Sequence, residues 1–491
     1  MPAYYLEAAV VVLGIVLMLM EAFVEKADKG IIARLGIVGL LIIFVSLFFA
    51  NGPADGSTMA LWNFYAFDAT AQFYKGFALI TTILVLLMSL DYRSTLQHYM
   101  GPDQESKGAG MGEFFYLPLF TCAGLMWMAS ATDLISIFVA LELVTISFYI
   151  LVAFLRRNVG SLEAGVKYLI LGALSTGFFV FGLTWLFGLT GQTQLGLIAT
   201  QLDNPASMLV QYPKALLFAL AMILVGLGFK VAAVPFQIWV PDVYQGAPSP
   251  ITAFLSVGSK AAGFVVGYRI LEPFLANDAT PQLITMILAI AGATIVFGNL
   301  AAMQQENFKR MLAYSSISHA GFLLLALGCI GTMDSRVSVS GAMAVYLGGY
   351  LAMTLIAFHA MCLVRDQLGS EDIASFKGLS QRSPFLAFVM LIAMVSLAGI
   401  PFTAGFFGKF FVFLLALQSG YYLLIGLAVV GVGAGFYYYL KIVKAMYWED
   451  AIDDKTVKVP LVARIAMIVL VLVIFVLGIY PSPILDLFLV N

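Results

Sequence analysis

Apolar stretches of about 20 residues follow one another along almost the whole chain, and this pattern constrains the fold more than any other feature. A helix needs about 20 apolar residues to cross the roughly 30 Å hydrocarbon core of a bilayer. Of the 491 residues, 62% are hydrophobic and only 11% are charged, whereas about a quarter of the residues in a soluble domain are charged. We therefore predict an all-α integral membrane protein and exclude a water-soluble fold.

Clusters of Gly, Pro, Asn and Asp separate the apolar stretches, as at residues 51–56 and 203–205, because these residue types favour turns. This division predicts about 14 transmembrane helices. The predicted spans are 5–25, 31–50, 71–91, 114–130, 132–155, 162–188, 214–240, 249–272, 281–302, 308–331, 340–365, 384–417, 419–447 and 461–488.

A short motif occurs in both the seventh and the twelfth predicted span: VPF at 234–236 recurs as IPF at 400–402. The two copies are five helices apart, so two five-helix units related in this way must have opposite orientations in the membrane. Inverted repeats of this kind are common in transporters. Each proline also interrupts a long apolar segment, as expected for a broken helix that lines a cavity. We therefore predict two inverted five-helix repeats, with helices seven and twelve broken.

The repeats divide the chain into four predicted regions. These are a three-helix N-terminal segment (1–113), a first antiporter-like repeat (114–272), a second, inverted repeat (281–447) and a C-terminal loop and helix (448–491).

The positions of the basic residues predict the orientation. Of the 25 Lys and Arg residues, seventeen lie in the loops after odd-numbered spans, three lie in even-numbered loops or at helix edges, and five lie in spans. Because cytoplasmic loops carry most Lys and Arg residues, this asymmetry places both termini on the non-cytoplasmic side.

Four charged residues are predicted near the middle of the bilayer: Glu142, Lys230, Lys260 and Lys409. A charged side chain at this depth costs about 2.5 to 3.5 kcal/mol even on the lenient insertion scale, so each one suggests a function. Charges at one depth on several helices suit a hydrated path along the membrane. A lysine can gain or release a proton, whereas an arginine does not deprotonate in proteins. The alternative is a static ion pair between Glu142 and Lys230.

Three further residues have competing interpretations. His319 lies in the tenth span beside Ser315, Ser316 and Ser318, so it could relay protons between the two repeats, or simply hydrogen-bond neighbouring helices. Lys167 could take part in transfer or form a helical i, i+4 pair with the glutamate one turn before it. Lys75 lies near the start of its span, and we expect its long side chain to reach the membrane surface.

Sequence signals for redox, nucleotide or metal chemistry are absent. The three cysteines lie singly in apolar segments, without a CxxC pair or a nearby histidine, so neither a disulfide framework nor a metal site is predicted. Neither a GxGxxG nor a Walker A sequence occurs, and three dispersed histidines do not form a haem-ligand pair. We therefore predict no cofactor on this chain, and a driving reaction on another polypeptide.

Four sequence runs closely resemble subunit N (the subunit 2 family) of bacterial NADH-quinone oxidoreductase, respiratory complex I. They are GFKVAAVPFQIWVPDVYQGAPSP at 228–250, FLSVGSK at 254–260, KRMLAYSSISH at 309–319 and GIPFTAGFFGK at 399–409. The resemblance extends from about residue 114 to residue 447 and is most specific at these runs.

The resemblance implies a 14-helix antiporter-like subunit with inverted repeats that moves protons in the bacterial inner membrane. The family's functional glutamate and three lysines match Glu142, Lys230, Lys260 and Lys409, and Lys167 matches another family lysine. Quinone, NADH, FMN and iron–sulfur clusters are then expected on other subunits. The partners are expected to be the other membrane subunits of complex I, including neighbouring antiporter-like subunits.

Two other functions compete with this interpretation. A subunit of a related multisubunit cation/proton antiporter, or of a membrane-bound hydrogenase, would share the lysines and the broken helices. The lysine at position 260 and the distal lysine at position 409 favour the complex I subunit. A scaffold of helices without transport would not explain five lysines in membrane spans.

Overall fold

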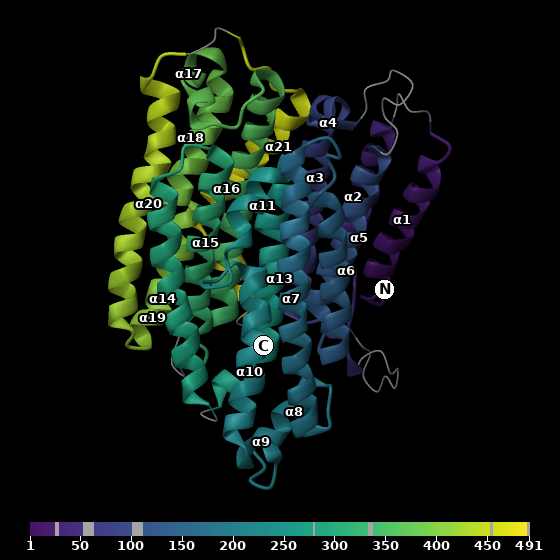
Figure 1. The fold of residues 1–491 in the computed structure, drawn as a ribbon, viewed down its shortest axis with the longest axis vertical. Coiled ribbons are helices and arrows are strands. Elements are labelled where there is room, and N and C mark those ends of the chain that lie inside the picture. Colours follow the sequence, from purple (N-terminus) through teal and green to yellow (C-terminus); the bar gives the residue numbers. More distant parts are fainter. Residues whose placement is uncertain are drawn as a thin grey trace.

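The computed structural model describes residues 1–24, 29–52, 63–100, 111–277, 280–331, 337–451 and 455–488. Within these ranges the chain forms helices joined by short connections, with β-bridges only as isolated pairs. The helices run roughly along one direction and pack side by side as a bundle (Figure 1).

The N-terminal part contains α1 (Tyr5–Glu21), α2 (Gly30–Leu47), α3 (Ala69–Asp91) and α4 (Arg93–Met100). Next follow α5 (Met111–Ser130), α6 (Leu134–Val152), α7 (Val159–Thr190), α8 (Leu195–Leu202), α9 (Met208–Gln211), α10 (Pro213–Val231), α11 (Trp239–Gly246), α12 (Ser249–Phe254), a π-helical turn (Leu255–Ser259) and α13 (Lys260–Ala276). The remainder comprises α14 (Pro281–Met303), α15 (Phe308–Leu327), α16 (Val339–Leu368), a 3₁₀ turn (Ile373–Phe376), α17 (Leu379–Arg382), α18 (Pro384–Ala398), α19 (Ala404–Gln418), α20 (Tyr422–Trp448), α21 (Leu461–Ile479) and α22 (Ser482–Leu487).

The helix lengths and compositions confirm the prediction of an all-helical membrane protein. Among the described residues, eleven helical segments are long and apolar enough to cross a membrane, and α18 and α19 are shorter apolar helices. Each of these helices satisfies its own backbone hydrogen bonds, which is what an element in hydrocarbon requires.

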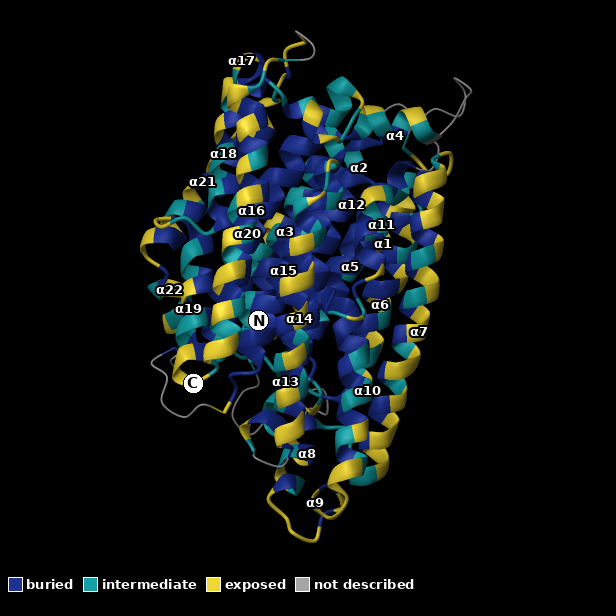
Figure 2. Ribbon diagram, turned by 60° about the vertical axis from the view of Figure 1, so that its left-hand side comes forward, coloured by how far each residue is buried: buried dark blue, intermediate teal, exposed yellow. Residues whose placement is uncertain are grey.

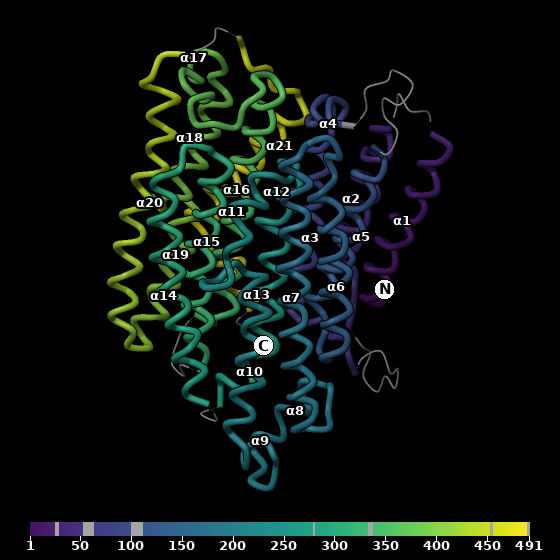
Figure 3. The backbone as a smooth tube through the Cα atoms, viewed as in Figure 1, coloured from purple at the N-terminus to yellow at the C-terminus, as the bar shows by residue number. Residues whose placement is uncertain are grey.

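Two predicted spans are each made of two helices. The predicted span 214–240 corresponds to α10, which ends at Val231, and to the start of α11. The predicted span 384–417 corresponds to α18 and α19. Both first helices end in a left-handed residue, Ala232 with φ 68° and Gly399 with φ 91°, and such a residue ends an α-helix. In Figure 3, α10 lies below α11, whereas α18 lies above α19.

Other boundaries also differ from the prediction. The last predicted span, 461–488, is divided into α21 and α22, with Pro481 between them. The segment 195–211, predicted as a loop, contains α8 and α9. These helices have 8 and 4 residues, too few to produce a recognisable apolar period.

The buried residues lie at the centre of the bundle, and the exposed ones lie mainly on its outer helices (Figure 2). Helices α12, α13, α15 and α16 are almost entirely buried. Outer helices such as α2, α7, α20 and α21 expose many Leu, Ile, Val and Phe side chains, as expected where a helix faces lipid. Two of the predicted site residues, Lys260 on α13 and His319 on α15, therefore lie on helices at the centre of the bundle.

The predicted orientation stays a prediction. Of the basic residues used for it, Lys26, Lys107 and Arg336 lie outside the described residues.

Candidate functional site

Lys230 lies in the last turn of α10, immediately before the chain leaves the helix at Ala232. Only 8% of the residue is exposed. Its amino group donates a hydrogen bond to the Thr145 hydroxyl on α6. The cation is therefore held at a helix C-terminus, where the helix dipole favours positive charge, and its hydrogen-bond partner is neutral.

Glu142 lies one helical turn before Thr145 on α6, on the same side of the helix. Its carboxylate accepts a hydrogen bond of 2.9 Å from the Thr176 hydroxyl on α7. Among the described residues, no ion pair joins Glu142 to Lys230; Lys230 bonds to Thr145, whereas Glu142 bonds to Thr176. The two predicted residues are thus brought to the same place, without forming the static ion pair considered as an alternative.

Lys260 is the first residue of α13, directly after the π-helical turn at 255–259. It is 2% exposed, and its amino group donates to the backbone carbonyl and the hydroxyl of Ser316 on α15. The Tyr350 ring on α16 lies 5.3 Å from the same nitrogen. Such π-helical turns are rare and occur frequently at functional sites.

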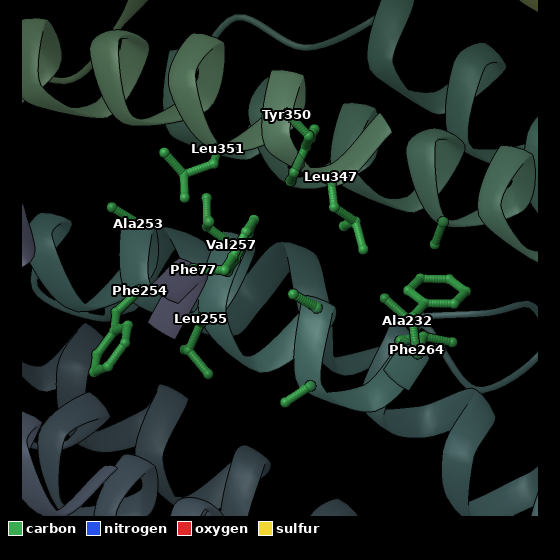
Figure 4. Packing of buried hydrophobic residues seen from close by; sticks show 14 of the residues in the cluster. Phe77, Ala232, Ala253, Phe254, Leu255, Val257, Phe264, Leu347, Tyr350 and Leu351 are labelled. Carbon is green, nitrogen blue, oxygen red and sulfur yellow. The ribbon is translucent and has the colours of Figure 1, made fainter. Parts of the chain in front are cut away.

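Apolar side chains of the π-helical turn and of α16 fill the space around Lys260. Figure 4 shows Leu347, Tyr350 and Leu351 of α16 above the turn that carries Leu255 and Val257. This packing keeps bulk water and lipid away from the lysine, so its charge interacts only with the polar groups that reach it.

Lys230 and Lys260 lie on neighbouring helices that approach closely at Gly263, one turn after Lys260. A Cβ atom at Gly263 would lie 2.9 Å from the Val231 side chain and 3.5 Å from the Cβ of Lys230. Since real Cβ atoms essentially never show contacts below 3.0 Å, only glycine allows this separation between α10 and α13.

His319 lies one turn after Ser316 on α15 and is 3% exposed. Its Nδ1 atom lies 2.6 Å from the Tyr346 hydroxyl, and its Nε2 atom lies 3.2 Å from the Tyr439 hydroxyl. The ring centroids of His319 and Tyr350 are 5.0 Å apart, so Tyr350 contacts both the histidine and Lys260. A neutral imidazole has one donor and one acceptor nitrogen, and both atoms have a hydroxyl partner here.

Lys409 lies on α19, beyond the second helix break, and is 6% exposed. Its amino group donates to the carbonyl oxygens of Leu397 and Ala398, at 2.8 Å and 2.9 Å. These carbonyls belong to the last turn of α18, which has no intrahelical donor for them. The amino group therefore serves as the cap of the broken helix.

Tyr346 connects the surroundings of His319 with those of Lys409. Its hydroxyl contacts His319, and its ring stacks on that of Phe322, with centroids 6.4 Å apart. The Phe322 ring in turn lies 5.8 Å from the Lys409 amino nitrogen. We call the following five residues, one from each of α6, α10, α13, α15 and α19, the lysine row: Glu142, Lys230, Lys260, His319 and Lys409. Tyr346 and Tyr350 of α16 contact His319 and Lys260 of this row.

All six predicted site residues fall within the part of the chain that matches a known family. A sequence profile of the family described as NADH:quinone oxidoreductase/Mrp antiporter, TM, matches residues 131–435. NADH-quinone oxidoreductase subunit N of Heliobacterium modesticaldum is 38% identical over 479 residues, which cover 97% of this chain and 96% of that protein. The chain belongs to the NADH-quinone oxidoreductase subunit N family. The resemblance of the four sequence runs to this family is thereby confirmed.

Solved structures extend the similarity of this subunit N family member to the whole fold. It matches a chain of respiratory complex I from Thermus thermophilus with bound aureothin, with a TM-score of 0.76, 30% identity and 98% of both chains covered. It also matches a chain of the membrane-bound sulfane sulfur reductase, an archaeal respiratory membrane complex, with a TM-score of 0.83, 25% identity, and 99% and 96% of the two chains covered.

Lys167 of this subunit N family member lies outside the lysine row. Its side chain is 40% exposed and forms ion pairs of 2.7 Å with both Glu163 and Asp242. The i, i+4 pair considered as an alternative is therefore present. Asp242, which sequence reasoning did not single out, also pairs with Arg310 at 2.8 Å. Lys167, Glu163 and Asp242 line a polar cavity of about 330 Å³ beside α11.

A second charged cluster closes the same end of the bundle. Glu371, in the connection after α16, accepts hydrogen bonds from Ser249 at 2.7 Å and from Lys309 at 3.1 Å, and pairs with Arg365. Burial alone would raise the pKa of the Glu371 carboxyl, but the nearby charges of Lys309 and Arg365 hold this pKa below its ordinary value. The ionised form of this carboxylate is therefore favoured.

The prediction that Lys75 reaches the membrane surface is wrong. Its side chain is 0% exposed and forms a 2.6 Å ion pair with Glu7, whose side chain is 3% exposed. The Tyr65 hydroxyl donates to both Glu7 oxygens at 3.2 Å and contacts the Lys75 amino group. A carboxylate on α1, 68 positions earlier in the chain, thus reaches the lysine on α3, and the ion pair takes the place of hydration for both charges.

Four residues that the sequence analysis did not single out contact members of the lysine row. The hydroxyls of Thr145 and Thr176 contact Lys230 and Glu142, and those of Tyr346 and Tyr439 contact His319. The spacing of Thr145 from Glu142, i and i+3 on one helix, was an available signal. The tyrosines come from other helices, 27 and 120 residues away from His319, where no local pattern marks them.

Proposed function

We propose that this chain is a proton-translocating membrane subunit of NADH-quinone oxidoreductase and that the lysine row carries the protons. The observation that supports this most directly is the nature of the lysine partners. Among the described residues, Lys230, Lys260 and Lys409 all lack a carboxylate within ion-pair distance and bond to hydroxyl or carbonyl oxygens instead. A buried lysine with neutral partners can exist with or without its extra proton, as a transfer group requires.

Transfer along the row would pass between neighbouring groups, and hydrogen bonds already link Lys260 to Ser316 and His319 to Tyr346. A proton on Lys230 alters the charge felt by Lys260 across the close approach at Gly263. From Lys260 the connection continues through Ser316 and Tyr350 to His319. From His319 the connection to Lys409 runs past Tyr346 and the Phe322 ring. Quinone reduction on other subunits supplies the energy.

We further propose a bundle of about 14 membrane spans with two inverted repeats, over 114–272 and 281–447, between an N-terminal segment (1–113) and a C-terminal one (448–491). The opposite vertical order of α10–α11 and α18–α19 supports inversion (Figure 3).

The same proposal includes the orientation of the chain in the membrane and its partner subunits. Both termini would lie on the non-cytoplasmic side of the bacterial inner membrane, and both chain ends lie in the lower half of the bundle (Figure 1). The partners would be the other membrane subunits of the complex, including antiporter-like neighbours. Quinone, NADH, FMN and iron–sulfur clusters would be bound by other subunits.

A second candidate function is a subunit of a cation/proton antiporter or of another ion-pumping respiratory complex. The matching family includes Mrp antiporters by its description, and a chain of the sulfane sulfur reductase complex has the same fold. Purifying the chain with its neighbours separates the two candidates. Co-purification of NADH-oxidising subunits supports the first function, and their absence in an intact complex supports the second.

The test of the proposed role uses Lys230→Ala and Glu142→Ala in the complete complex, reconstituted into vesicles. Proton pumping coupled to quinone reduction should fall sharply, while the subunit composition stays that of the wild type. Lys444→Ala on α20, which forms an exposed pair with Glu449 at 3.5 Å, is the control. Normal pumping by either row variant would refute the assigned role.

A further inference from the structure

A stripe of hydroxyl groups runs along α12 and the π-helical turn toward Lys260. Ser249, Thr252 and Ser256 are three and four residues apart, a spacing that places side chains on one face of a helix. Lys260 follows four residues after Ser256. We call the three hydroxyl residues the hydroxyl stripe; each is no more than 1% exposed, and the other side chains from 250 to 257 are apolar. A helix at the centre of the bundle thus has one polar face, which ends at Lys260.

The two ends of the hydroxyl stripe form hydrogen bonds with other parts of the chain. A buried serine or threonine in a helix commonly bonds the carbonyl four residues before it, and Thr252 does so at 3.3 Å. Ser249 instead donates to the Glu371 carboxylate at 2.7 Å. The Ser256 hydroxyl lies 2.8 Å from the Tyr350 hydroxyl on α16. Both ends of the stripe therefore connect to polar groups outside their own helix.

The outer end of the stripe lies at the wall of the polar cavity beside α11. Glu371, the partner of Ser249, lines this cavity of about 330 Å³ together with Lys167 and Asp242. A water molecule in the liquid occupies about 30 Å³, so the cavity has room for several. From Ser249 to Lys260 the chain rises by about 16 Å, roughly half of the hydrocarbon core. The predicted orientation places residues 241–248, between the seventh and eighth predicted spans, on the cytoplasmic side. The stripe therefore spans the distance between a cavity that admits water and the buried lysine.

Hydroxyl groups reach Lys260 from two sides. On one side, the Tyr244 hydroxyl of α11 lies 3.3 Å from the Ser316 hydroxyl, and Ser316 accepts a hydrogen bond from the Lys260 amino group. Tyr244 is 1% exposed, and the two residues that follow it line the cavity. On the other side, the Tyr350 ring lies 5.3 Å from the amino nitrogen of the lysine, and the Tyr350 hydroxyl contacts Ser256. The stripe and Tyr244 therefore provide two connections from the cavity to Lys260.

The connection from the same cavity toward Lys230 consists of aromatic rings. Tyr168 directly follows Lys167, which lines the cavity. Phe229 directly precedes Lys230. The Trp239 ring packs against both, with centroid distances of 4.8 Å to Tyr168 and 5.2 Å to Phe229. Within the described part of the chain, no hydrogen bond joins Lys230 to a residue that lines the cavity. The cavity therefore has a polar connection to Lys260 and an aromatic one to Lys230.

We propose that protons enter the protein through the polar cavity and reach Lys260 along the hydroxyl stripe, with a parallel branch through Tyr244. This entry route rests on the proposed proton translocation. Each hydroxyl accepts a proton from the oxygen before it and releases its own proton to the next oxygen, so every hydroxyl is neutral again after a transfer. Hydronium in the cavity supplies the proton, and the uncharged Lys260 amine takes it up as an ammonium group. Where neighbouring hydroxyls are beyond hydrogen-bond distance, one water molecule from the cavity bridges them.

The experiment uses the complete complex in vesicles and compares the double variant Tyr244→Phe/Ser256→Ala with the wild type. This variant removes one hydroxyl from each branch and keeps the buried ring. The initial rate of proton pumping should fall at least about tenfold. The ratio of this rate in H₂O to the rate in D₂O should rise, because proton transfer to Lys260 becomes the slowest step. A purely structural effect of the lost hydrogen bonds would leave this ratio unchanged.

The double variant Tyr168→Phe/Ser89→Ala is the matched control. It also removes one tyrosine and one serine hydroxyl, and both residues are no more than 1% exposed. Tyr168 contacts Trp239 beside the same cavity, and Ser89 donates to the carbonyl four residues before it in α3, at 2.7 Å. This complex should pump protons as the wild type does.

Wild-type pumping by Tyr244→Phe/Ser256→Ala, or an equal loss in the control, would overturn the entry route. So would a loss confined to the control, because protons would then pass the aromatic rings toward Lys230. If the double variant does not assemble, the single variants Tyr244→Phe and Ser256→Ala decide, and wild-type pumping by both would overturn the route. Lys409→Arg separates this result from a failure of the proposed function. Lost pumping in Lys409→Arg with normal pumping in the double variant would refute the entry route alone, and normal pumping in both would refute the proposed function as well.

Discussion

Two buried lysines in this chain have opposite surroundings. Lys75, in the N-terminal segment, contacts the Glu7 carboxylate at 2.6 Å. Lys409, at the second helix break, contacts only the carbonyl oxygens of Leu397 and Ala398 at hydrogen-bond distance. An ion pair fixes the charge of its lysine, whereas neutral partners accept either protonation state. Burial alone therefore does not mark a proton-transfer group; the chemical type of the partner does.

The largest effect is expected at the ion pair. Replacing Lys75 by Met leaves the Glu7 charge buried without a partner, which should lower the free energy of unfolding by about 3–5 kcal/mol. The double variant Glu7→Leu/Lys75→Met should recover most of this loss. Denaturation of the purified complex in detergent measures both. If the single variant is as stable as the wild type, the pair does not stabilise the N-terminal segment.

A variant of His319 tests the transfer side of this comparison, because His319 lies between Lys260 and Lys409 in the lysine row. His319→Phe keeps a ring in the buried space but removes both nitrogen atoms that contact Tyr346 and Tyr439. We expect the pumping rate to fall about tenfold, equivalent to about 1.4 kcal/mol, with quinone reduction in uncoupled vesicles less affected. Unchanged pumping would mean that protons do not pass this residue. Tyr314→Phe, which lies on the same helix, serves as the control.

A smaller effect is expected at Lys167, because its ion pairs are partly exposed to water. Lys167→Ala should leave the free energy of unfolding close to that of the wild type. Its effect on pumping distinguishes two roles. A reduced pumping rate would support the role implied by the family resemblance, and a normal rate would leave the pairs with Glu163 and Asp242 as a surface feature.

The smallest effect appears only in acid. Because the pKa of Glu371 is lowered in the folded protein, its contribution to stability is complete above the ordinary pKa of a glutamate, about 4.3. The contribution is lost as the pH falls through the lowered value. Thermal unfolding of the complex between about pH 5 and pH 3 should therefore show a loss of stability that Glu371→Gln does not show. Equal loss of stability in the wild type and in Glu371→Gln over this pH range would contradict a stabilising role of the Glu371 charge.

The sequence predicts the membrane fold and the chemical types of the row, because the length of apolar segments and the cost of buried charge are local properties. It also predicts helix breaks close to Pro235 and Pro401; in the structure α10 ends at Val231 and α18 ends at Ala398. The sequence does not predict which residues of other helices contact the lysine row. Tyr439 reaches His319 from α20, and no spacing within the sequence indicates how far a helix is rotated toward its neighbour.

The wrong prediction for Lys75 has the same physical origin. Its position near a span end favours an exposed lysine when only its own helix is considered. The deciding contacts come from Glu7 on α1 and Tyr65 before α3. Likewise, the Asp242 pair with Lys167 depends on where α11 leaves the break, which the motif around the proline does not specify.

The most direct test of the account replaces Lys409 by Arg in the reconstituted complex and measures the number of protons pumped per quinone reduced. An arginine keeps the positive charge that caps α18, but it does not release its proton. Lys441→Arg is the control, since Lys441 also donates to a backbone carbonyl, that of Gln305 at 3.0 Å. The account predicts that Lys409→Arg loses proton pumping while Lys441→Arg retains it. A normal proton count in Lys409→Arg would contradict proton transfer through the row.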